Sequence, residues 1–210
     1  RPAPSGGYKH GLPEGERTDV GEGDISAETL GRNFFVYRPP HIRQSPAMGH
    51  LARVTNVVQE VVSSGRYTGA IWLEGSPNVE ESIYWLNLLI DTPVPIVGNA
   101  SQRPHGSIGN DGDLNIVHSV EYLASRIWAD ENGRDDVGAV VIQEKQIFTA
   151  RDVQKADARP GGYVATGGHG GIVGTLGNSG PASLTFRPVK RHTHKSAVNI
   201  NRLPGTVQGV

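Results

Sequence analysis

Three short apolar runs, separated by segments with helical spacing, are the feature that most restricts how this chain can fold. The runs cover residues 69–73, 94–97 and 138–143, and we expect the first of them to be buried. Between them, residues 79–89 and 114–129 carry apolar side chains three and four positions apart, which is the period of an amphipathic helix. Alternating strands and helices of this length are typical of an open, mostly parallel sheet. The pattern therefore predicts a three-layer, Rossmann-like α/β domain.

The flanking segments set the expected domain boundaries. Residues 1–33 are rich in Gly, Pro, Glu and Ser, and we expect them to form an irregular N-terminal arm. Residues 34–204 are the predicted α/β domain, with alternation typical of one more strand at 184–189. Residues 205–210 are predicted to be a C-terminal tail or the start of an interdomain linker.

The start and the later part of this domain give further local signals. Residues 34–37 are predicted to form a short strand, and the spacing of the valines predicts a helix over 47–63. Ser45 before Pro46 resembles a helix N-cap followed by proline at the first helical position. Residues 139–150 leave two interpretations open, a strand that ends in a polar loop or a tight hairpin.

Composition excludes several classes of function. The chain has no cysteine, so disulfides, thiolate catalysis and Cys-zinc sites are excluded, and a cytoplasmic location is favoured over a periplasmic or secreted one. A net charge of −1 provides no basic surface for nucleic acid. No apolar run approaches the roughly 18–20 residues that a membrane span needs. We expect no cofactor and no metal site, because His192 and His194 lie beside three basic residues and no carboxylate follows.

The turn between residues 73 and 79 is the first place where chemistry could occur. Gly75 allows close backbone approach, and Ser76 offers a hydroxyl next to the free N–H groups of a helix start. The alternative is that Ser76 only caps the helix, with Pro77 at its first position.

A lysine and a polar loop are the other candidates. Lys155 follows the third strand region, where it could move a proton at a sheet end, or lie in a solvated loop. The polar, Gly-rich loop at 98–113, which includes Asn99 and Ala100 near its start, could hold a ligand or be a plain surface loop. It does not contain the phosphate-binding motif Gly-x-x-x-x-Gly-Lys-Ser/Thr.

Several motifs resemble, in order, the N-terminal domain of the bacterial-type L-asparaginase/glutaminase family. Residues 75–82, Gly-Ser-Pro-Asn-Val-Glu-Glu-Ser, resemble the Gly-Thr-Asp-Thr-x-Glu-Glu-Thr turn of that family. Residues 150–155 resemble its Ala-Arg-x-Val-x-Lys motif, which carries a catalytic lysine. Further matches are Ser45-Pro-Ala-Met48, Pro95-Ile-Val-Gly98 through Arg103-Pro104, Asp111-Gly-Asp-Leu-Asn115 and Gly168 to Val173.

The resemblance implies acyl-transfer chemistry on an amide and assigns roles to particular residues. Ser76 and Lys155 take the catalytic positions. The substrate-binding positions fall on Ser45, Gly75, Pro77, Asn99 and Ala100.

Two departures from the family alter the expected reaction. The Thr-Gly-Gly-Thr motif of the first strand, which carries one catalytic threonine, does not occur in the sequence. Pro77 replaces the aspartate that grips the substrate's amino group, and proline has neither an acceptor side chain nor an N–H. We therefore expect the substrate to be an amide, cyclic amide or imide without a free α-amino group.

These departures also imply partners. We expect a second polypeptide to supply the first strand and the C-terminal domain, within a higher oligomer. This incomplete domain is not expected to be stable as a monomer, because a missing strand leaves backbone groups unpaired. Two alternatives stay open: a non-catalytic binding or regulatory subunit with the same fold, and a truncated true asparaginase or glutaminase.

Overall fold

The computed structural model describes residues 48–76, 78–103, 108–159, 161–165, 171–177 and 180–188. Its helices are α1 (Met48–Ser63), α2 (Val79–Leu89) and α3 (Gly112–Ser125). Its strands are β1 (Ala70–Leu73), β2 (Ile96–Asn99), β3 (Val140–Gln143), β4 (Gln146–Thr149), β5 (Val153–Lys155), β6 (Tyr163–Ala165), β7 (Ile172–Thr175) and β8 (Ser183–Leu184). The predicted strand at 34–37, the predicted cap at Ser45 and the arm at 1–33 lie outside the described residues.

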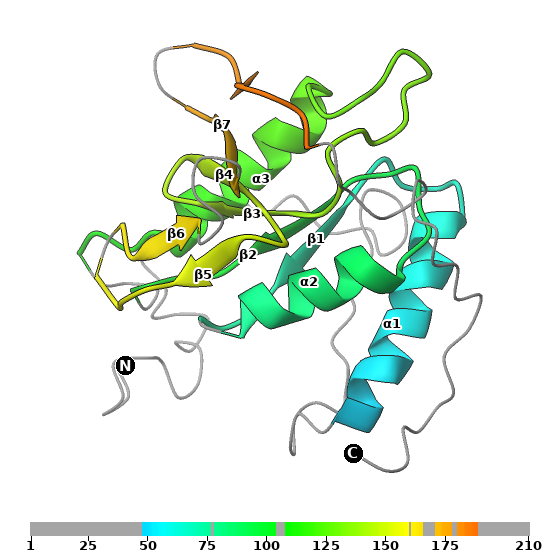
Figure 1. Cartoon of the computed structure of the whole chain (residues 1–210), viewed down its shortest axis with the longest axis horizontal. Helices are drawn as coiled ribbons and strands as arrows, with labels where there is room; N and C mark the ends of the chain where they lie inside the picture. The colour runs from blue at the N-terminus through cyan, green and yellow to red at the C-terminus, as the bar shows by residue number, and fades with distance from the viewer. Residues whose placement is uncertain are drawn as a thin grey trace, which may run out of the picture.

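The main sheet combines a parallel and an antiparallel half. Its strand order is β1-β2-β3-β4-β7-β8, and β1, β2 and β3 run parallel to one another. From β3 onward every pairing is antiparallel. Strands β5 and β6 form a separate antiparallel pair that lies beside the start of α2, in front of the main sheet (Figure 1). The predicted α/β class is confirmed.

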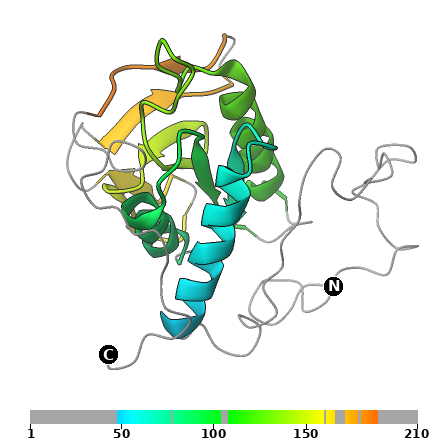
Figure 2. The same cartoon turned by 90° about the vertical axis from the view of Figure 1, so that its right-hand side faces the viewer.

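Helices cover both faces of the parallel half, which gives the predicted three layers (Figures 1 and 2). Neighbouring residues of β3 point to opposite faces, as they must in a strand. Val141 packs in the cluster that α1 and α2 share with β5 and β6. Val140 and Ile142 pack in the cluster that contains Tyr122 of α3. Strands buried on both faces explain why these runs are continuously apolar.

Residues 139–150 form a hairpin, which decides between the two interpretations. Ala150 N donates to Ala139 O, and β3 pairs with β4 in regular register. Glu144 and Lys145 have φ of 48° and 69°, the left-handed conformation that a two-residue hairpin turn requires. The polar loop expected after Ile142 is therefore absent at this point of the described chain.

Three other expectations were wrong in detail. Among the described strands β1 lies at the edge of the sheet, and it is only half-buried, with Leu73 59% exposed. Helix α3 ends four residues before the predicted boundary at 129, because Arg126 adopts a left-handed conformation with φ of 56°. The strand predicted at 184–189 is reduced to Ser183–Leu184. Among the described residues, no helix has the length and apolar character needed to cross a bilayer.

Candidate active site

Ser76 lies in the turn that joins the end of β1 to the start of α2. The helix begins at Val79, with Asn78 in the N-cap position. The interpretation of Ser76 as an N-cap was therefore wrong, and Pro77 lies outside the described residues. The Ser76 side chain instead contacts a residue far away in the sequence.

That residue is Tyr163 of β6, whose hydroxyl donates to Ser76 Oγ at 2.8 Å. Tyr163 lies directly opposite Lys155 in the β5–β6 pair. Directly opposed residues of an antiparallel pair project to the same side. Ser76 and Lys155, the two positions predicted to be catalytic, are thereby connected through one hairpin.

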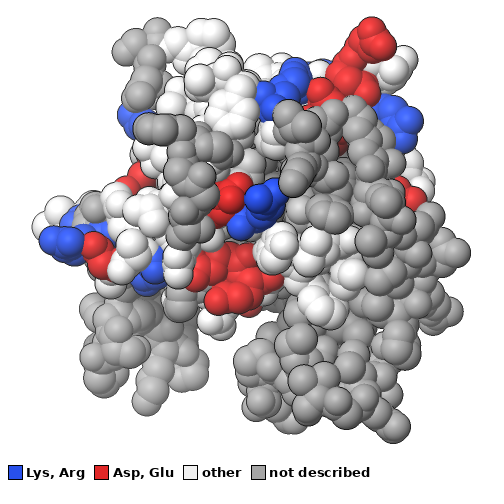
Figure 3. All heavy atoms as spheres, viewed as in Figure 1, with Lys and Arg blue, Asp and Glu red and all other residues white. Residues whose placement is uncertain are grey.

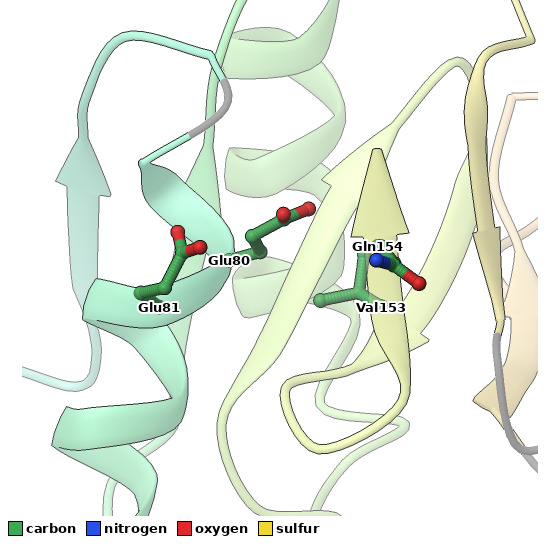
Figure 4. Close-up of a pocket in the computed structure, with 4 residues that line it drawn as sticks. All are labelled: Glu80, Glu81, Val153 and Gln154. Atoms are coloured by element: carbon green, nitrogen blue, oxygen red, sulfur yellow. The ribbon is translucent and has the colours of Figure 1, made fainter. Parts of the chain in front are cut away.

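Glu80 ties this hairpin to α2. One Glu80 carboxylate oxygen accepts a hydrogen bond from the backbone N–H of Lys155. Burial raises the pKa of Glu80 above its usual value, and the charge of Glu81 adds to this, whereas the Lys155 N–H and ammonium oppose it. Figure 4 shows Glu80 extending from α2 toward β5, and Val153 extending back toward α2. Together with Glu81 and Gln154 they line a pocket at this junction.

The surface around the site carries charges of both signs. Lys and Arg side chains are interspersed with Asp and Glu over the described part of the face in Figure 3. Within the described residues, no group of three or more His, Cys, Asp or Glu is placed to hold a metal ion. His192 and His194 lie outside that part of the chain.

A second polar cluster surrounds Asp111, at the start of α3. Its carboxylate accepts from the backbone N–H groups of Gln102 and Arg103, each at 2.9 Å, and from Ser101 Oγ at 3.0 Å. Burial alone would raise the pKa of Asp111, but these hydrogen bonds outweigh burial and lower it. Asp111 thus fixes the loop that leaves β2 while remaining ionised.

Asn99 and Ala100 use their polar groups within the fold. Asn99 is buried, and its Nδ2 donates to Ser119 Oγ of α3 at 2.7 Å. The Ala100 carbonyl accepts from Asn115 Nδ2 at 2.9 Å. Gly75, by contrast, is exposed beside open space. Gly75 adjoins Ser76 in the chain, whereas the Asn99 side chain and the Ala100 carbonyl bind residues of α3. Ser45 and Pro77 lie outside the described residues.

Sequence reasoning missed Tyr163 as a partner of Ser76, and included Glu80 only as one residue of the motif at 75–82. The local signal for Tyr163 was its place in a short alternating segment, Tyr163-Val164-Ala165, with the first residue buried and the second exposed. A local sequence pattern of this kind does not predict which distant residue the side chain contacts.

Comparison with known proteins identifies the family. Residues 43–173, more than half of the chain, match the family described as Asparaginase, N-terminal. The chain belongs to the asparaginase family. This confirms the resemblance drawn from the motifs around Ser76, Lys155 and Asp111.

Individual asparaginase-family relatives agree. The chain is 31% identical over 157 residues to the glutaminase-asparaginase of Acinetobacter glutaminasificans, covering 74% of this chain and 44% of the relative. It is 35% identical over 109 residues to the L-asparaginase of Bacillus licheniformis, and the match covers 52% of this chain and 32% of the relative. It is 24% identical over 135 residues to L-asparaginase 2 of Escherichia coli, and the match covers 64% of this chain and 36% of the relative. The chain thus spans less than half the length of these relatives.

Proposed function

We propose that this chain forms part of an amidohydrolase that cleaves a carbon–nitrogen bond other than a peptide bond. The observation that carries the proposal is the Ser76–Tyr163–Lys155 arrangement. A hydroxyl lies at the carboxyl end of a parallel strand, where α/β sheets bind ligands, next to the hairpin that bears the lysine. The relatives named as L-asparaginases and glutaminase-asparaginases support the same chemistry.

The proposed reaction is acyl transfer. A hydroxyl oxygen attacks the amide carbon, its proton passes through Lys155 to the departing nitrogen, and the carbon–nitrogen bond breaks. Water then attacks the acyl ester, which releases the carboxylic acid and restores the hydroxyl. Ser76 serves either as this nucleophile or as the group that positions the attacking water. Backbone N–H groups stabilise the oxyanion.

The substrate we propose is an amide, cyclic amide or imide without a free α-amino group. Pro77 stands where the family carries an aspartate that binds the amino group. A charge-assisted hydrogen bond of this kind contributes about 1.5–3 kcal/mol, and proline cannot supply it. A true asparaginase or glutaminase is the second candidate, which the names of the relatives favour.

We propose further that a second polypeptide pairs with β1 and contributes the rest of the active site. In the described sheet β1 pairs only with β2, and the other side of β1 is an edge. Its half-buried residues and the exposed Leu73 provide apolar surface that a further strand would cover. Exposed Leu114, Val117 and Val120 on α3 are suited to contacts between copies in a higher oligomer.

The test uses the complete assembly as it purifies from the native organism. Intact-mass measurement and N-terminal sequencing should identify a second polypeptide, and a single species would contradict the subunit proposal. Asparagine should then be compared with succinamic acid, which is asparagine without its α-amino group, and with succinimide. We expect succinamic acid or succinimide to be hydrolysed at least as well as asparagine. A kcat/KM for asparagine more than about tenfold higher would overturn the proposed specificity.

A further inference from the structure

Tyr163 is buried in the core, and its hydroxyl has one described partner. The side chain is 4% exposed and packs in the cluster with Val153 and Val79. Its neighbour across the hairpin is Lys155, and its hydroxyl donates to Ser76 Oγ. A buried ring with a single polar tip places that tip more precisely than a flexible surface residue would.

The phenol is neutral at any physiological pH. Burial raises the pKa of Tyr163 to about 12, the hydrogen bond to Ser76 works against this, and the charges of Glu80, Asp111 and Glu81 add to it. A neutral phenol has one proton, and here that proton is directed at Ser76 Oγ.

This direction determines what the serine can do. A hydroxyl that accepts on its oxygen keeps its own proton for another acceptor, and the accepted bond makes that proton a better donor. As the Ser76 proton leaves, negative charge grows on Oγ, where the Tyr163 donor is already positioned to stabilise it.

We infer that Tyr163 is a positioning residue that orients the Ser76 hydroxyl and supports charge on its oxygen, through the 2.8 Å hydrogen bond between them. The inference rests on the proposed amidohydrolase function. It holds for both roles of Ser76, because an oriented, polarised hydroxyl is required to attack a carbonyl and to position a water molecule.

The decisive variant is Tyr163→Phe in the complete assembly, which keeps the buried ring and removes the hydrogen bond. The substrate is whichever of asparagine, glutamine, succinamic acid and succinimide the wild type hydrolyses fastest. We expect kcat to fall about three- to tenfold, the equivalent of one net hydrogen bond, with KM changed less than about twofold. Tyr163→Phe should have no further effect in a Ser76→Ala background, since the two residues act as a pair.

Tyr122→Phe is the matched control. Tyr122 is a buried tyrosine on α3 whose hydroxyl has no hydrogen-bond partner in the described structure. Its replacement by phenylalanine should leave kcat unchanged. Wild-type turnover with an unaltered kcat in Tyr163→Phe would overturn the inference and leave the proposed function standing. The inference would also be overturned if Tyr163→Phe lowered kcat in the Ser76→Ala background by the same factor as in the wild type. A wild-type assembly that hydrolyses none of the four amides would overturn both.

Discussion

Lys155 and Tyr163 are directly opposed in the antiparallel β5–β6 pair, so that an amine and a phenol project from the same side of one hairpin. The Glu80 carboxylate accepts a hydrogen bond from the backbone N–H of Lys155, and Ser76 Oγ accepts one from the Tyr163 hydroxyl. The hairpin therefore connects the turn after β1 with the first turn of α2.

Replacing Lys155 by alanine should abolish most of the activity while leaving the fold intact. The hydrogen bond to Glu80 uses the backbone N–H of Lys155, which the substitution keeps. Loss of a positioned proton carrier should lower kcat by about 100- to 10,000-fold. Arg151→Ala, an exposed cation on the preceding turn, is the control and should have little effect. Unchanged turnover in Lys155→Ala would favour the non-catalytic subunit.

Replacing Asp111 by asparagine should destabilise the protein at neutral pH by about 1–3 kcal/mol, because donors of the loop after β2 lose their charged acceptor. Since the folded-state pKa of Asp111 lies below the usual 3.8, its stabilisation is complete above that value and is lost as the pH falls through the lowered pKa. Urea unfolding from pH 7 to pH 3 should therefore show wild type and variant converging in acid. Asp113→Asn, an exposed neighbour, should show a much smaller effect at pH 7.

His118 should make stability fall as the solution is acidified below about pH 6.5. Burial lowers the pKa of His118, Glu121 opposes this and Lys145 adds to it, so the folded state favours the neutral ring more than the unfolded chain does. The unfolded chain binds the extra proton first, and stability declines from the usual value of 6.5 down to the lowered one. Thermal unfolding at pH 7.5 and 5.5 should show a smaller loss for His118→Gln than for wild type. Equal losses would rule out this role.

Gly98 should not tolerate a methyl group. A Cβ built on this residue would lie 2.1 Å from Cγ1 and 2.7 Å from Cδ1 of Ile83, because β2 and α2 pack closely at this point. Gly98→Ala should lower the free energy of unfolding by about 1–3 kcal/mol, as expected for overpacking. Gly75→Ala, where a Cβ meets nothing within 4 Å, should leave stability nearly unchanged and provides the comparison. Equal stabilities of the two variants would contradict the packing seen here.

Much of the scaffold was predictable because its signals are local. The spacing of apolar residues placed α2 at Val79–Leu89, with the same bounds that the structure shows. Helix α3 was placed correctly but ended early at Arg126, since the left-handed conformation of that residue has no clear mark in the sequence. The hairpin at 139–150 was one of two open interpretations, because the Glu144-Lys145 turn carries no glycine.

The candidate site was predictable only in part. The motifs pointed to Ser76 and Lys155 without showing what either contacts. Ser76 and Tyr163 are 87 positions apart, and their contact depends on how the β5–β6 pair packs against α2. Burial of Asn99 likewise follows from α3 lying over the end of β2, which no local pattern reports.

The sequence by itself determined the alternation of helices and strands from α1 to β3 and the family motifs, because periodicity and motif spacing are properties of neighbouring residues. Only the tertiary structure decided that β1 is the edge of the described sheet, and that the Ser76 hydroxyl binds Tyr163 instead of capping α2. The physical reason is that strand pairing and side-chain contact depend on packing between distant segments. That packing is fixed by the shape of the whole core and not by any one stretch of the chain.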